Sequence, residues 1–271
     1  LEEAQVVKTE FEFQQSEFPV LEEESKAETI FSGEKEIPQI LLVEDNMEVR
    51  SFIRSFLDPH YPVLEAADGQ IGLEKATELI PDIVISDVMM PNMDGYELCT
   101  RLKEEEKTAH IPVILLTARS AKDDKIQSLE IGADAFVTKP FDADELLAQI
   151  SNLLENRKRL KLKFAQGAFL DPVIPDFSEK DQGFLKKIND VIEEHLDEEG
   201  FGLEELLRAL AMSRTQLHRK LKALTNQSTT QYMRGIRLEH ALKILEGGEY
   251  NVTEVAFRVG FNSQTYFSKS F

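Results

Sequence analysis

The chain has 271 residues, of which 42% are hydrophobic and 30% charged, and its formal net charge is −19. This length suits two ordinary domains, and the sequence lacks the run of about 20 apolar residues that a membrane-spanning helix needs. We therefore expect a cytoplasmic protein that makes no membrane contact through this segment. With only one cysteine, Cys99, an internal disulfide is excluded and a cysteine-based zinc site has no support.

Residues 1–37 form an acidic segment. They contain eleven Glu and three Lys, a composition typical of a solvated, flexible linker. The chain begins at Leu1 without a methionine or a signal-peptide pattern. We therefore expect it to be a piece of a longer protein.

Short apolar runs alternate with amphipathic stretches between residues 38 and 158. The apolar runs predict strands at 40–43, 63–64, 83–85, 113–116 and 135–137. The amphipathic stretches predict helices at 49–57, 71–79, 96–102, 126–131 and 146–154. This alternation predicts an α/β fold with a doubly wound, five-stranded parallel sheet. In such a sheet, ligands bind outside the carboxyl ends of the strands.

Polar residues follow the predicted strands at that edge. Glu44 and Asp45 follow the first strand, Asp87 the third, Thr117 the fourth and Lys139 the fifth. Three carboxylates repel one another unless a cation lies between them, and Mg²⁺ is a hard ion that such oxygen ligands favour. A lysine and a hydroxyl nearby would bind the oxygens of a phosphoryl group. Asp87, on the central strand, is the predicted nucleophile.

Each of these residues also has a plain structural interpretation. A strand-end aspartate such as Asp87 usually caps a turn, Glu44 could adjoin a helix N-cap, and Thr117 could cap the next helix. Asp94 and Gly95 fit a turn before a helix, and we assign them no chemistry. The convergence of the acidic residues with Lys139 and Thr117 at one edge favours function.

Four motifs in this region occur in the order and spacing of a known family. They are ILLVEDN at 40–46, DIVISDVMMPNMDG at 82–95, VILLTA at 113–118 and GADAFVTKPF at 132–141. On these motifs, residues 38–158 resemble the response-regulator receiver family. The resemblance implies a flavodoxin-like fold and phosphorylation of Asp87 by a histidine kinase.

The resemblance also implies roles for the neighbouring residues. The implied Mg²⁺ ligands are Glu44, Asp45, Asp87 and the main-chain carbonyl of Met89. Thr117 and Lys139 would bind the phosphoryl oxygens. Phe136 would reposition on activation, although a strand phenylalanine is more often a core residue. The family often has Asp in place of Glu44 and tyrosine in place of Phe136, so a phenol hydrogen bond is lost here.

After a connector at residues 159–182, the pattern is helical to the end of the chain. Residues 206–238 contain seven Lys and Arg and no Asp or Glu, which gives this part a face able to attract an anion despite the acidic average. The basic residues are Arg208, Arg214, Arg219, Lys220, Lys222, Arg234 and Arg237.

Two helix-turn-helix units are predicted in this region. The first has a short helix at 203–210 and a second helix opened by a capping box at Ser213 and Gln216, whose leucines at 217, 221 and 224 face inward. A long helix at 229–245 leads to the second unit, with a helix at 252–259 and a helix capped by Ser263. Such units can enter successive major grooves if their recognition helices lie about 34 Å apart.

Residues 183–271 resemble the AraC family on the stretches 203–221, 237–245 and 255–271. By position, the implied base-edge contacts are Thr215, His218, Arg219, Gln264, Thr265 and Lys269. The implied phosphate contacts are Arg214, Lys222 and Ser263. The glycine that the family commonly carries after the first unit falls within residues 226–228 here, where asparagine can tolerate positive φ. The family's closing helix would follow Phe271, so we expect the second unit to be truncated.

Together these resemblances imply a transcription regulator controlled by phosphorylation, with a histidine kinase and DNA as partners. The acidic linker precedes the receiver, an order that resembles hybrid two-component proteins with a kinase upstream. This fragment would then be a phosphoryl acceptor rather than an enzyme, and a homodimer is compatible with it. The alternative is a phosphorelay or phosphate-sink receiver whose helical tail serves dimerisation.

Overall fold

The computed structural model describes residues 37–118, 131–165, 177–198 and 200–271, with the side chains of 162–165 left aside. The chain divides into the units Leu1–Lys35 and Glu36–Phe271, and the described residues belong to the second. The predicted acidic linker and most of the predicted helix at 126–131 lie outside the described residues. No helix among the described residues is long and apolar enough to cross a membrane.

The first half of the second unit is built on a parallel sheet with the strand order β2-β1-β3-β4-β5. Its strands are β1 (Ile40–Val43), β2 (Val63–Ala66), β3 (Ile83–Asp87), β4 (Val113–Thr117) and β5 (Ala135–Thr138). The order reverses beside β1, because the chain first adds β2 on one side and then β3, β4 and β5 on the other. The predicted doubly wound sheet is therefore confirmed.

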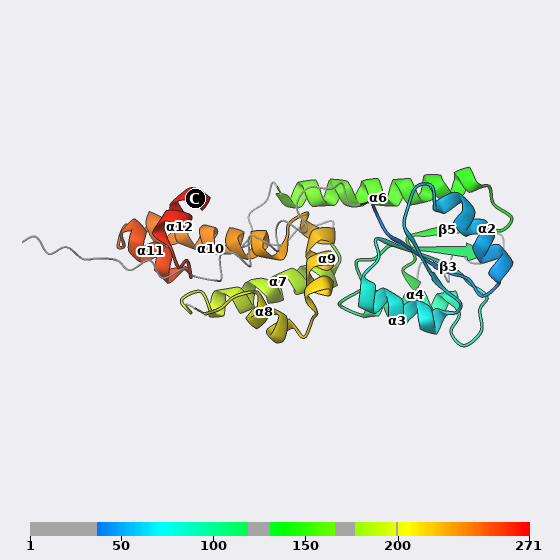
Figure 1. Ribbon diagram of the computed structural model, residues 1–271, viewed down its shortest axis with the longest axis horizontal. Coiled ribbons are helices and arrows are strands. Elements are labelled where there is room, and N and C mark those ends of the chain that lie inside the picture. Colours follow the sequence, from blue (N-terminus) through cyan, green and yellow to red (C-terminus); the bar gives the residue numbers. More distant parts are fainter. Residues whose placement is uncertain (1–36, 119–130, 166–176, 199) are drawn as a thin grey trace, which may run out of the picture. The chain divides into compact units, whose positions relative to one another are not determined.

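Helices cover both faces of this sheet (Figure 1). They are α2 (Met47–Leu57), α3 (Gly69–Leu79), α4 (Gly95–Glu104) and α6 (Ala143–Ala165). Leu41 and Val43 of β1 belong to a core shared with α3 and α4, whereas Ile40 and Leu42 belong to a core shared with α2 and α6. Alternate residues of a strand point to opposite faces, so a strand covered on both sides is apolar throughout.

Helix α6 continues beyond residue 158 to Ala165, and the next helix begins at Glu179. The predicted connector at 159–182 therefore contains helical residues at both of its ends, 159–165 in α6 and 179–182 in α7. The boundaries at 158 and 182 stay predictions.

The second half of the unit is helical, as predicted. Its helices are α7 (Glu179–Glu194), α8 (Leu203–Leu210), α9 (Arg214–Thr225), α10 (Thr229–Glu246), α11 (Val252–Arg258) and α12 (Gln264–Ser270). The capping box of Ser213 and Gln216 opens α9, and Ser263 caps α12. Asn226 ends α9 with a φ of 62°, which confirms that asparagine takes the left-handed position here.

Helix α10 joins two separate apolar cores. Its residues Tyr232, Met233 and Ile236 pack in a core with α7, α8 and α9. Ala241 belongs instead to the core of α11 and α12. In Figure 1, α9 meets one end of α10, while α11 and α12 gather at the other.

Candidate functional site

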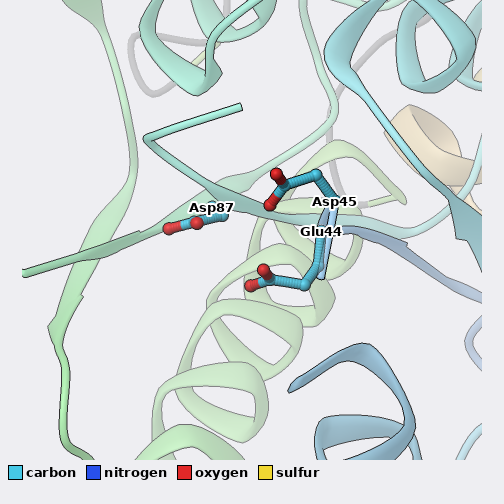
Figure 2. Close-up of side chains that lie close together, drawn as sticks. All are labelled: Glu44, Asp45 and Asp87. Carbon is cyan, nitrogen blue, oxygen red and sulfur yellow. The ribbon is translucent and has the colours of Figure 1, made fainter. Parts of the chain in front are cut away.

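Glu44, Asp45 and Asp87 meet at the carboxyl edge of the sheet, where β1 and β3 end. One carboxylate oxygen of each lies within 4.8 Å of the others, and Figure 2 shows the three side chains lying close together. Glu44 is 1% exposed and Asp87 8% exposed, whereas Asp45 is exposed. The cluster is therefore buried at its base and open on the side of Asp45. A set of carboxylate oxygens of this kind suits a hard divalent cation such as Mg²⁺.

Lys139 brings a positive charge into the acidic cluster. Its Nζ lies 2.9 Å from Glu44 Oε2 and 3.0 Å from Asp87 Oδ1. Burial lowers the pKa of Lys139, but its hydrogen bonds to Glu44 and Asp87, together with the negative charges of these two carboxylates, outweigh this effect and raise the pKa. Lys139 is thus held in its charged form beside Asp87.

Burial raises the pKa of Glu44, and the nearby charge of Asp87 raises it further. The hydrogen bond from Lys139 lowers that pKa only in part. A buried carboxylate beside a second carboxylate costs free energy in its charged form, and a bound cation would offset that cost. The electrostatics of the cluster therefore favour cation binding.

The other residues predicted for this pocket lie around it. Thr117 is 4% exposed at the end of β4, and its register partner on β5 is Thr138. Met89, two residues after Asp87, has a side chain that is 76% exposed. Phe136 pairs in register with Leu115 and packs, partly buried, against the core under α3 and α4. This packing is what a core phenylalanine would show, and the switch role of Phe136 stays a prediction.

Most of the residues predicted to contact DNA lie at accessible positions of the two helix-turn-helix units. On α9, Thr215 and Arg214 are exposed and Lys222 is partly exposed. Arg214 forms an ion pair of 2.5 Å with Glu204 of α8, and Lys222 Nζ donates to the carbonyl of Asn226. In the second unit, Ser263 is partly exposed at the N-cap, and the predicted contacts on α12, Gln264, Thr265 and Lys269, are all exposed.

Arg219 is partly buried, and its Nη1 donates to Gln39 Oε1 at 2.7 Å and to the carbonyl of Leu79 at 2.6 Å. Gln216, on the same helix, donates to the carbonyl of Thr77 at 2.8 Å. Within the unit 36–271, α9 therefore contacts the segment that ends α3 and the residue before β1.

His218, predicted to contact a base edge, is instead buried at 9% exposure, so this arrangement does not present it to DNA. Lys220, counted among the residues available to an anion, is fully buried as well. Its Nζ lies 3.4 Å from Asp181 and 4.3 Å from the centre of the Phe184 ring, and burial lowers its pKa. Helix α9 contacts α3 and α6 as well as α10. Its buried face is therefore wider than the leucine stripe that the sequence pattern reveals.

Comparisons with known proteins agree with this geometry. The family model of the response regulator receiver domain matches residues 40–151. Residues 40–151 belong to the response regulator receiver family. A helix-turn-helix domain, of the AraC type, matches residues 206–271. A receiver domain followed by such a domain is the composition of a two-component transcription regulator.

Three similar proteins illustrate the extent of the match. "Histidine kinase P4" of Formosa agariphila is 41% identical over 97% of this chain, which spans 19% of that protein. The "DNA-binding dual master transcriptional regulator RpaA" of Synechocystis is 40% identical over 46% of this chain and 52% of its own length. A solved signal receiver domain of a histidine kinase from Syntrophus aciditrophicus is 39% identical over 45% of this chain and 93% of that domain, with a TM-score of 0.43. The chain thus spans about half or less of the length of the two full-length relatives, histidine kinase P4 and RpaA.

The receiver domain also contains two supporting residues to which the sequence analysis assigned no role at this site. Arg50 donates to the carbonyl of Glu44 at 2.6 Å and holds the turn that carries the acidic pair. Gly95 lies so close to β3 that an added Cβ would come within 2.2 Å of the carbonyl oxygen of Asp87. In the sequence, the only feature that could have indicated the role of Gly95 is the Asp-Gly pair at 94–95. No local pattern distinguishes Arg50 from other helix arginines.

Proposed function

We propose that this chain is a transcription regulator in which Asp87 accepts a phosphoryl group from a histidine kinase and the state of the receiver domain controls DNA binding. The observation that carries this proposal is the position of Asp87, at the centre of the carboxyl edge and within 3.0 Å of Lys139. Glu44 and Asp45 complete an acidic cluster around it. This is the donor set that phosphoryl transfer to a carboxylate requires.

In the proposed reaction, a carboxylate oxygen of Asp87 attacks the phosphorus atom of a phosphohistidine. The new O–P bond forms as the P–N bond breaks, and the imidazole leaves with the electron pair of that bond. The hydroxyl of Thr117 and the ammonium of Lys139 would donate to the phosphoryl oxygens. Lys139 is already in place, because it bonds to the carboxylate that becomes phosphorylated.

A Mg²⁺ ion would be held by Glu44, Asp45, Asp87 and the main-chain carbonyl of Met89. When bound, it would neutralise negative charge on the transferring phosphoryl group. The buried carboxylate of Glu44, whose pKa is raised by burial, supports a cation at this position.

Contacts within the unit 36–271 offer a route from the receiver domain to DNA. Arg219 of α9, a predicted base contact, bonds to Gln39 and to the carbonyl of Leu79. Phosphorylation adds about −1.5 to −2 of charge. A rearrangement that shifts α3 or β1 would change how α9 is held, and so alter DNA binding.

The histidine kinase partner would reside in the same parent protein. The similarity to a protein named "Histidine kinase P4" along 97% of this chain supports that arrangement. The receiver domain would then receive its phosphoryl group from a kinase domain upstream.

The decisive experiment adds Mg²⁺ and acetyl phosphate to the protein and follows its mass together with its binding to a duplex selected from a random DNA pool. We expect the wild type to gain one phosphoryl group and to change its DNA affinity. Asp87→Asn should lose both effects. Asp94→Asn is the matched control, since Asp94 caps α4 nearby and asparagine is an equally good N-cap.

Each result has a definite meaning. Labelling of Asp94→Asn but not of Asp87→Asn would identify the acceptor. Labelling without any change in DNA affinity would leave the relay or phosphate-sink role. No labelling of the wild type would contradict the acceptor role of Asp87.

A further inference from the structure

The two helix-turn-helix units have separate apolar cores, and α10 runs through both units. The apolar core of the first unit ends along α10 at Ile236, and that of the second includes Ala241. Arg237 lies between them. The relative orientation of α9 and α12 therefore depends on α10 and on the other contacts that join the two units there.

Arg237 makes such a connection. Its Nη2 donates to the carbonyl of Phe201, just before α8, at 2.7 Å, and its Nη1 donates to the carbonyl of Gly260, between α11 and α12, at 3.2 Å. One guanidinium group therefore links the backbone of the first unit to the turn of the second. The planar fork of arginine can serve two acceptors in fixed directions, which a lysine ammonium on its flexible stem cannot reproduce.

The turn at Gly260 is shaped for this close approach. Gly260 has a φ of +77°, and an added Cβ would lie 2.8 Å from the carbonyl oxygen of Leu196 and 3.1 Å from the guanidinium carbon of Arg237. Leu196 lies in the segment between α7 and α8. The second unit thus rests directly on the backbone of the first, with Arg237 in the same junction.

We propose that Arg237 is a positioning residue that holds the two helix-turn-helix units in one relative orientation and thereby sets the spacing of the two DNA half-sites. The claim about half-site spacing rests on the proposed DNA-binding function. The claim that Arg237 fixes the relative orientation of the two units does not. Because successive base pairs are about 3.4 Å apart along the duplex, a small rotation at Arg237 would move α12 out of register with its half-site.

This role differs from the phosphate contact that its place in the basic stretch would suggest. The guanidinium of Arg237 is partly buried and donates to two main-chain carbonyls. The guanidinium therefore binds the protein backbone rather than DNA. Its loss should change the relative orientation of the two units more than it weakens the general attraction to DNA.

The first test measures the junction without DNA. Spin labels are attached to cysteines introduced at Ala209 of α8 and Ser268 of α12, both exposed, while Cys99 is 0% exposed and stays unlabelled. We expect one narrow distance distribution in the wild type and in Lys243→Met, a control that removes an exposed charge from the same helix. In Arg237→Met and Arg237→Lys the distribution should become about twofold broader or gain a second population.

The second test measures half-site spacing on a duplex selected by the wild type from a random pool. Inserting one base pair between the half-sites should weaken wild-type binding by roughly 100-fold and Arg237→Met binding by only about 10-fold. A residue that merely adds charge or stability would lower both affinities and leave their ratio unchanged. Circular dichroism checks that each variant keeps its helices.

An unchanged distance distribution in Arg237→Met would overturn the proposal, as would an unchanged spacing ratio. If the wild type selects no duplex, the proposed DNA-binding function fails, and the distance distributions still decide whether Arg237 holds the junction.

Discussion

Glu44 shows how one buried side chain can serve both electrostatics and ligand binding. It is 1% exposed, bonds to Lys139 and shares an acidic cluster with Asp45 and Asp87. Desolvation makes its charge costly, and the ion pair with Lys139 offsets only part of that cost. A divalent cation would stabilise the same charge, so Glu44 would couple metal binding to the charge state of the pocket.

Removing this charge should weaken Mg²⁺ binding. We expect Glu44→Gln to lower the Mg²⁺ affinity of the receiver domain by at least about tenfold, because one carboxylate of the cluster is lost. Isothermal titration with MgCl₂ measures the effect. Glu74→Gln, an exposed change on α3, should leave the affinity unaltered, and an equal loss in both variants would contradict a specific role for Glu44.

Mg²⁺ affinity should also fall as the pH decreases. A proton and a cation compete for Glu44, and its pKa is raised above the ordinary value of 4.5. Protonation, and with it the loss of affinity, should therefore begin at a higher pH than for an ordinary glutamate. Titrations with MgCl₂ at a series of pH values test this prediction. Over the same pH interval, the Mg²⁺ affinity of Glu44→Gln should depend less on pH. A wild-type profile that matches that of the variant would exclude Glu44 as the titrating group.

At the scale of whole elements, close approach of backbone segments positions the pocket. Gly95 begins α4, and its amide donates to the carbonyl of Val88 at 3.0 Å, so the loop after β3 folds back onto the strand that carries Asp87. Glycine is required because any Cβ would collide with the carbonyl of Asp87. The orientation of Asp87 thus depends on a residue eight positions further along the chain.

We predict that Gly95→Ala destabilises the protein by about 2–4 kcal/mol, since the backbone must shift to relieve a contact of 2.2 Å. Gly183→Ala is the matched control, because Gly183 is the fifth residue of α7 and an added Cβ there meets nothing within 4 Å. There, alanine should stabilise the helix by about 0.5–1 kcal/mol. Urea denaturation followed by circular dichroism gives both values, and similar midpoints for the two variants would refute the steric argument.

At the scale of the whole molecule, α9 is shared between two tasks. It carries predicted DNA contacts, and it also bonds to the end of α3 and to Gln39 through Gln216 and Arg219. An arginine held in this way is less available to a base edge. On the proposed function, these contacts would weaken DNA binding before phosphorylation.

A charge placed opposite Arg219 tests this coupling. Gln39→Lys should repel the Arg219 guanidinium and raise the DNA affinity of the unphosphorylated protein by about tenfold, while leaving phosphorylation of Asp87 intact. Gln70→Lys adds the same charge at an exposed position on α3 and should have little effect. Fluorescence anisotropy with the selected duplex measures both, and equal affinities for the two variants would rule out restraint of α9 through Gln39.

The amino-acid pattern alone was sufficient to predict the parallel sheet and the helical second half, and the structure confirms both. Strand-end residues could be placed at one edge because parallel strands present their carboxyl ends together, so Glu44, Asp45, Asp87 and Lys139 meet as expected. Helix starts such as Ser213 were also predictable, because capping is a local interaction between residues three positions apart.

Only the tertiary structure decided which polar residues are buried and what they bond to. His218 and Lys220 lie within a buried face of α9 that apolar periodicity does not reveal, and Arg237 joins two carbonyls that are 59 positions apart along the chain, at 201 and 260. Hydrogen bonds and ion pairs act over a few ångströms, whereas sequence patterns report only on neighbours along one element. Contacts between distant segments therefore depend on how the elements pack, and that packing gives Arg237 and Gly95 their roles.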